Sequence, residues 1–219
     1  MKIYSSEISG SLKVKGDIKA ENYIVQTSVT QVTMSYASGS SAFGDSPSLD
    51  THQFSGSLFI SGSRIDLDDG NNNVAIGKSA GAGITTGTGN TIVGSLAGDT
   101  MDTNTDNTII GHSAGGGSSA NANKLVAIGR QALVEDLTTD ADGTVAIGYQ
   151  AGNSITDQSL NTLIGYKAGA AYNAVGSTVV GYGAYDVGTS GGYNTIMGAN
   201  AAGALSAAGT HNVFIGYET

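Results

Sequence analysis

A five-residue phrase, repeated nine times between Asn73 and Gly216, is the feature that most constrains the fold of this chain. Most copies begin with asparagine, continue with valine or threonine, then an apolar residue and isoleucine or valine, and end with glycine. The phrase glycines are Gly77, Gly94, Gly111, Gly129, Gly148, Gly165, Gly181, Gly198 and Gly216, at spacings of 17, 17, 18, 19, 17, 16, 17 and 18 residues. A repeat of this period is typical of a solenoid, so we predict an all-β parallel β-roll or β-solenoid of about nine coils over residues 71–219.

The apolar residues of the phrase point to both sides of the predicted strands. With the phrase glycine as position zero, positions −1 and −3 face one way and position −2 faces the other. Position −1 is Ile, Val or Met, position −3 is Val or Thr, and position −2 is Ala, Ile, Leu, Val or Phe in all copies. Strands buried on both sides need cover on both sides. A thin solenoid covers only its inside, so we expect an identical neighbour to cover the other face.

Two further positions are nearly constant. Asparagine occupies position −4 in six of nine copies, where stacked asparagines would hydrogen-bond neighbouring coils as a side-chain ladder. Position +3 is alanine in the first eight of the nine copies, which indicates that a larger side chain does not fit between closely approaching strands or subunits. We therefore interpret these alanines as trimer or packing positions: Ala80, Ala97, Ala114, Ala132, Ala151, Ala168, Ala184 and Ala201.

Residues 1–70 have a different character. Ser11–Lys15 and Gln31–Tyr36 alternate apolar and polar residues, as half-exposed strands do. Large apolar residues are too few for an independent core. We expect a β-rich segment of short strands and turns that serves attachment, or is ordered by winding with other copies in a trimer.

The repeat resembles a known family. Val74–Ala80 and Val145–Ala151 look like the head repeat of YadA-type trimeric autotransporter adhesins. This resemblance, over residues 73–216, implies a parallel β-roll in which three chains associate around one axis. Segments such as Glu21–Val25 and Phe43–Leu58 resemble fibre and appendage proteins of tailed bacteriophages. Together the resemblances imply a trimeric phage fibre whose residues 1–70 contact other virion structural proteins.

Composition excludes several classes of function. The formal charge of −9 argues against nucleic acid and anionic membranes as partners. The chain has no cysteine, no apolar stretch long enough to span a membrane, and no apolar signal-peptide core at Met1–Glu7. His52, His112 and His211 are widely separated and lack a neighbouring acid pair. We expect no catalytic, cofactor or metal site, although Asp66–Asn71 and Asp140–Gly143 contain acids of the kind that bind calcium.

Position +1, directly after the glycine, varies and carries one candidate binding feature. Tyr149, Tyr166 and Tyr182 occupy it in three consecutive coils. In-register coils would stack them as an aromatic ladder, which either stabilises the solenoid or binds sugar rings at the surface. The sequence favours the structural reading.

The expected function is that of a structural virion protein. A homotrimeric tail fibre or similar appendage would contact a host surface glycan or protein. The first alternative is a fragment of a bacterial trimeric autotransporter adhesin, located at the cell surface. The second is a polysaccharide-degrading tailspike, which would require a carboxylate pair on a groove.

Overall fold

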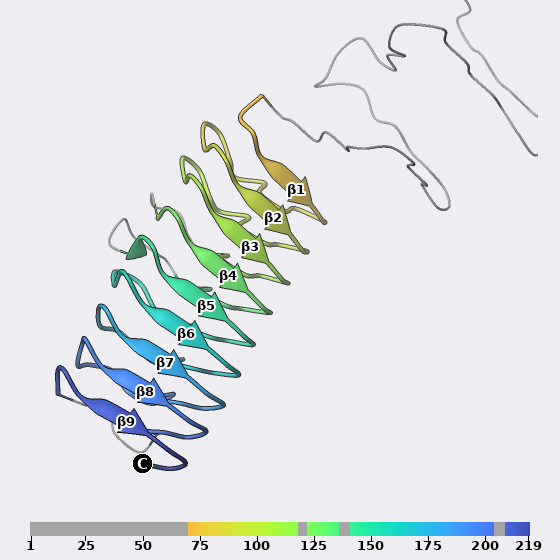
Figure 1. Ribbon diagram of the computed structural model, residues 1–219. Helices are drawn as coiled ribbons and strands as arrows, with labels where there is room; N and C mark the ends of the chain where they lie inside the picture. Colours follow the sequence, from red (N-terminus) through yellow and green to blue (C-terminus); the bar gives the residue numbers. More distant parts are fainter. Residues whose placement is uncertain (1–69, 118–121, 136–140, 204–208) are drawn as a thin grey trace, which may run out of the picture. The chain divides into compact units, whose positions relative to one another are not determined.

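Nine short parallel strands form one continuous sheet along the repeat region (Figure 1). The computed structural model describes residues 70–117, 122–135, 141–203 and 209–219, so the expectations for residues 1–69 lie outside the described part of the chain. The strands are β1 (Val74–Ile76), β2 (Thr91–Val93), β3 (Thr108–Ile110), β4 (Val126–Ile128), β5 (Val145–Ile147), β6 (Thr162–Ile164), β7 (Thr178–Val180), β8 (Thr195–Met197) and β9 (Val213–Ile215).

Each strand consists of positions −3 to −1 of one phrase, and each pairs in register with the next. In the middle of the sheet, for example, Ile92 pairs with Ile109 and Thr91 with Thr108. The chain between two strands closes one turn, and nine strands define about eight turns. The predicted all-β parallel solenoid is therefore confirmed. From here on, each coil is numbered by the strand that it contains.

Position −2 points into the solenoid and positions −3 and −1 point outward. In β3, Ile109 is fully buried while Thr108 is half-buried and Ile110 is exposed. The same alternation holds through coils two to eight. Fully buried residues at position −2 are Ile92, Ile109, Ala127, Ala146, Leu163, Val179 and Ile196.

The predicted asparagine ladder is present and buried. The side-chain oxygen of Asn73 accepts hydrogen bonds from the backbone N–H and the side-chain amide of Asn90, both at 2.9 Å. Asn90 accepts the same pair from Asn107, at 3.1 and 3.0 Å. The Asn90 amide also donates to the carbonyl of Asn104 across its own coil, at 2.8 Å. Each side chain therefore ties one coil to the next and one corner of a coil to another, so that buried polar groups are satisfied.

The phrase glycines allow the backbones of successive coils to approach closely. Gly111 has φ +137°, and a Cβ placed on it would lie 2.5 Å from the carbonyl oxygen of Gly129. Its N–H donates to the carbonyl of Val93 at 2.8 Å, which continues the inter-coil hydrogen bonds past the end of the strand. A side chain at this position would break the stack at its corner.

We predict that Gly111→Ala lowers the free energy of unfolding by at least about 3 kcal/mol, because the methyl group would collide with backbone that cannot move independently. Gly116→Ala is the matched control. A Cβ there meets its nearest atom, the carbonyl oxygen of Ser113, at an ordinary 3.4 Å, and its φ is not positive. Denaturant titration should show a change within about 1 kcal/mol for this control. Equal effects of the two substitutions would contradict the backbone-contact argument.

Candidate functional site

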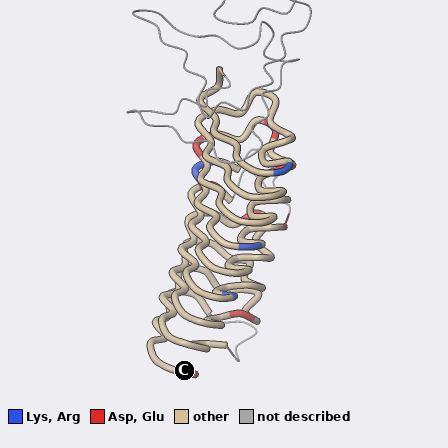
Figure 2. The backbone as a smooth tube through the Cα atoms, turned by 90° about the vertical axis from the view of Figure 1, so that its right-hand side faces the viewer, with Lys and Arg blue, Asp and Glu red and all other residues tan. Residues whose placement is uncertain are grey.

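The outward sides of β1–β9 form a continuous apolar surface, here called the outer sheet face and defined by positions −3 and −1. Position −1 is Ile, Val or Met in every coil, and no charged residue occurs at either position. Ile110 is 36% exposed, Ile164 37% and Met197 42%. Figure 2 shows how sparsely charged residues are distributed along the coils. In a single chain this face is open to water along the whole sheet.

The alanines at position +3 lie inside the solenoid. Seven of them have no exposed surface within one chain, and Ala80 is partly buried against the core. They are packing positions of the chain's own core and present no surface that a second chain could touch. The surface with the apolar character of a subunit contact is the outer sheet face instead.

The three tyrosines predicted at position +1 stack as a ladder. The ring centroids of Tyr149 and Tyr166 are 5.1 Å apart with an interplanar angle of 17°, and those of Tyr166 and Tyr182 are 5.0 Å apart at 10°. Arg130, at the same position in coil four, places its guanidinium carbon 5.8 Å from the Tyr149 ring centroid. The Lys167 ammonium lies 5.8 Å from the Tyr166 ring centroid. Tyr149, Tyr166, Tyr182 and Arg130 at position +1, with Lys167 from position +2, thus form a stabilising group of rings and cations.

Stacking limits what this tyrosine ladder can bind. Tyr166 has a tyrosine ring on each side, and Tyr149 lies between Tyr166 and the Arg130 guanidinium. A sugar ring that stacks on an aromatic side chain needs an open ring face. Tyr182 is 60% exposed and its far side adjoins coil eight, where position +1 is Ala199. The open face of the ladder is therefore at its Tyr182 end.

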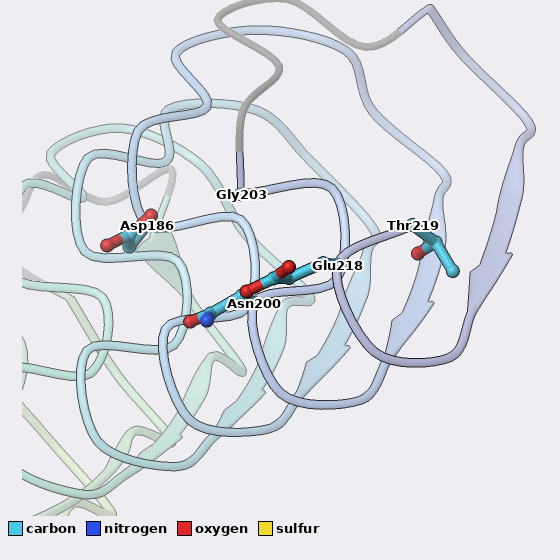
Figure 3. Close-up of a pocket in the computed structure, with 5 residues that line it drawn as sticks. All are labelled: Asp186, Asn200, Gly203, Glu218 and Thr219. Atoms are coloured by element: carbon cyan, nitrogen blue, oxygen red, sulfur yellow. The ribbon is translucent and has the colours of Figure 1, made fainter.

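A pocket lies further along the solenoid, on coils seven to nine (Figure 3). It has a volume of about 450 Å³ and is lined by Asp186, Asn200, Gly203, Glu218 and Thr219. Asn200 and Glu218 both occupy position +2, in coils eight and nine. The N–H of Glu218 donates to the carbonyl of Ala199 at 3.1 Å, which keeps these two coils in register. Sequence analysis did not single out these residues, because all but Thr219, which takes the place of the usual alanine at position +3, belong to columns whose residue type varies.

The acids and histidines of the described residues have local roles. Asp142, from one of the acidic runs, accepts a hydrogen bond of 2.6 Å from the N–H of Asn123 on the preceding coil. His112 contacts the neighbouring Ser113 hydroxyl, and His211 stacks on Tyr193 with centroids 5.1 Å apart. In the part of the chain that the structure describes, no group of three or more His, Cys, Asp or Glu side chains is placed to hold a metal ion.

Two buried tyrosines were also missed by the sequence analysis. Tyr172 and Tyr185 have no exposed surface, and their rings contact each other at 5.4 Å between centroids. The Tyr172 hydroxyl donates to the Ser177 hydroxyl at 2.5 Å, and burial raises its pKa above the ordinary value. Both residues lie in the variable stretches between phrases, where periodicity gives no indication of burial. They fill the core rather than a binding surface.

Comparisons with protein-family models, with curated proteins and with solved structures found no match. Within the described residues no helix is long and apolar enough to cross a membrane.

We predict that Tyr166→Ala destabilises the solenoid by about 1–3 kcal/mol, because it removes two stacked ring contacts. Tyr182→Ala removes one such contact and should cost about half as much. Tyr166→Phe retains both ring contacts, so its melting temperature should stay close to that of the parent protein. If Tyr166→Ala melted like Tyr166→Phe, the ladder would have no stabilising role.

Proposed function

We propose that this chain is the rod-like part of a homotrimeric attachment appendage, such as the tail fibre of a tailed bacteriophage. The observation that carries the proposal is the outer sheet face, whose apolar residues repeat in every coil and remain open to water in a single chain. Large contiguous apolar surfaces of this kind mark sites of association. A fibre needs a long, thin and repetitive structure, and the in-register stack of coils provides one.

An identical chain is the occupant that fits this face best. The face has one residue pattern along all nine strands, so a copy of the same chain offers the same pattern with the same inter-coil spacing. Three copies around one axis would bring Ile, Val and Met side chains together with Thr methyl groups. The lack of charged residues at positions −3 and −1 means that this assembly would bury no unpaired ion.

The biological setting follows from the resemblances rather than from the fold. In the phage reading, residues 1–70 join the rod to other virion proteins, and the rod or its distal end contacts a host glycan or protein. A head fragment of a bacterial trimeric adhesin would share the trimeric rod but act at the cell surface. Neither role requires catalysis, so we propose that the protein is not an enzyme.

The first test is the mass of the protein in solution. Sedimentation equilibrium should give three times the 21.8 kDa of one chain. A folded monomer at micromolar concentration would overturn the proposed assembly.

A charged substitution on the outer sheet face should break the assembly and leave the coil intact. We predict that the double substitution Ile110→Glu and Ile164→Glu yields monomers, because each trimer would otherwise bury six additional carboxylates at an apolar contact. Thr86→Glu, at an exposed turn residue away from β1–β9, is the control and should remain trimeric. Circular dichroism should show the same β signal for both variants. A trimeric double variant would place the subunit contact elsewhere.

A second experiment tests whether the protein attaches to host cells and whether it cleaves their polysaccharide. The labelled trimer is incubated with cells of the bacterial host, and bound protein and released reducing sugar are measured together. Attachment requires binding that unlabelled trimer competes away, and the non-enzymatic proposal requires no rise in reducing ends. A rise in reducing ends would favour the polysaccharide-degrading tailspike.

A further inference from the structure

Position +1 is interrupted once between tyrosines, at Ala199 in coil eight. Tyr182 precedes this residue by one coil, and Tyr217 follows it by one coil. The N–H of Asn200 donates to the carbonyl of Tyr182 at 2.8 Å, and that of Glu218 to the carbonyl of Ala199 at 3.1 Å. These hydrogen bonds hold the three coils in register at this position. The column therefore has a tyrosine on the coil before and on the coil after the place where the ring is missing.

The space at Ala199 has the height of one ring. Parallel strands lie about 4.8 Å apart, so the backbones carrying Tyr182 and Tyr217 are separated by roughly 9.6 Å. Within the tyrosine ladder, one ring occupies each 5.0–5.1 Å step. A ring inserted above Ala199 would have an aromatic neighbour on each face. Tyr182 and Tyr217 are 60% and 71% exposed, so both are accessible to such a ring.

The pocket of coils seven to nine is next to this gap along the chain. Ala199 and Tyr217 are followed directly by Asn200 and Glu218, which line the pocket together with Asp186. Glu218, the neighbour of Tyr217 in the chain, raises the pKa of the Tyr217 hydroxyl, chiefly by hydrogen bonding. Figure 3 shows the polar side chains of the pocket on successive turns.

The Asn200 side chain occupies the space that a side chain at position +2 of coil seven would need. The only glycine at position +2 in the nine coils is Gly183, in coil seven. A Cβ on Gly183 would meet the side-chain oxygen of Asn200 at 2.7 Å and Asp186 Oδ2 at 3.8 Å. The absence of a side chain at position +2 of coil seven therefore leaves room for the Asn200 amide of coil eight, near the Asp186 carboxylate. Two columns are interrupted on adjacent coils, and the pocket lies at that point.

We propose that the gap above Ala199 and the adjoining pocket bind one neutral pyranose ring of a glycan. A pyranose has C–H groups on both faces, which pack on aromatic rings, and hydroxyls around its edge. The Asp186 and Glu218 carboxylates accept hydrogen bonds from hydroxyls, and the Asn200 amide both donates and accepts. A flat aromatic ligand would use the rings but leave the carboxylates without donors. Anionic sugars are disfavoured by two carboxylates on a chain of formal charge −9.

This site names a ligand class for the host contact, and rests on the proposed function only for its biological role. Sugar binding is measured on the purified, full-length protein, whereas the fibre proposal is tested by its mass and by attachment to cells. A protein that is trimeric but does not bind sugar would disprove this inference alone. A monomer that binds sugar would disprove the proposed trimer alone.

The probes are methyl glycosides of glucose, galactose, mannose and N-acetylglucosamine, with galacturonate as the charged match of galactose. Saturation-transfer NMR should detect at least one neutral glycoside with a dissociation constant on the order of millimolar, as expected for a single ring on an open site. Galacturonate should bind at least about tenfold more weakly than galactose if galactose binds.

Ala199→Tyr is the decisive variant. It fills the gap with tyrosine, the residue found at position +1 in coils five, six, seven and nine. It should abolish the saturation-transfer signal and preserve the fold, and Tyr217→Ala should weaken binding at least about tenfold. Ser95→Tyr makes the same kind of substitution at position +1 of coil two, and should bind like the parent. No neutral glycoside bound at about 50 mM, or unchanged binding by Ala199→Tyr, would overturn the proposal.

Discussion

Contact between the backbones of successive phrase glycines is the constraint on which the stack depends. A Cβ on any of the first eight phrase glycines would lie 2.1 to 2.5 Å from the carbonyl oxygen of the next one. The coils therefore meet at one corner with no side chain between them. This contact sets the same spacing for the asparagine ladder inside and for the tyrosine ladder outside. Both ladders work because the corner repeats at the distance that suits stacked rings and inter-coil hydrogen bonds.

Because the corner is fixed, a small core side chain at one position of a coil is offset by a larger one at another position. Coils four and five carry only alanine at position −2, Ala127 and Ala146, where the coils on either side of them, coils two, three and six to eight, carry Ile, Leu or Val. Leu133 compensates in coil four: it replaces the usual glycine at position +4 and is fully buried. Its side chain reaches the next coil, since a Cβ on Gly152 would lie 2.9 Å from it. Uneven loop lengths are tolerated for the same reason, because the phrase alone fixes the register.

The sequence predicted the regular part of this structure because period and pattern carry that information. The parallel order of the strands follows from the phrase, and so does the opposite facing of position −2 against positions −3 and −1. Which of the two sides faces the core does not follow from it. The backbone of the corners was not predictable. Position −5 is left-handed in every coil, including Leu160 at φ 60° and Tyr193 at φ 59°, residue types that rarely adopt this conformation. The stack imposes that conformation through inter-coil hydrogen bonds, which local preference does not reveal. The alanines illustrate a related limit: constancy indicated tight packing but not whether one chain or two provided it.

In a repeat protein, constant positions explain the structure and departures from them suggest what is specific to one region. Glycine at position zero and the apolar residues of each strand build any coil of this solenoid, so they cannot distinguish one part of it from another. Gly183 and Ala199 interrupt two columns of side chains on adjacent coils, and neither is needed for the turn it occupies, because other coils make the same turn with larger residues. Ala199 leaves the ring position open between the coils of the exposed Tyr182 and Tyr217, and Gly183 makes room for the Asn200 amide near Asp186. A stack whose spacing suits one aromatic ring per coil becomes a recognition site by the omission of a ring. This requires no change in the coil itself.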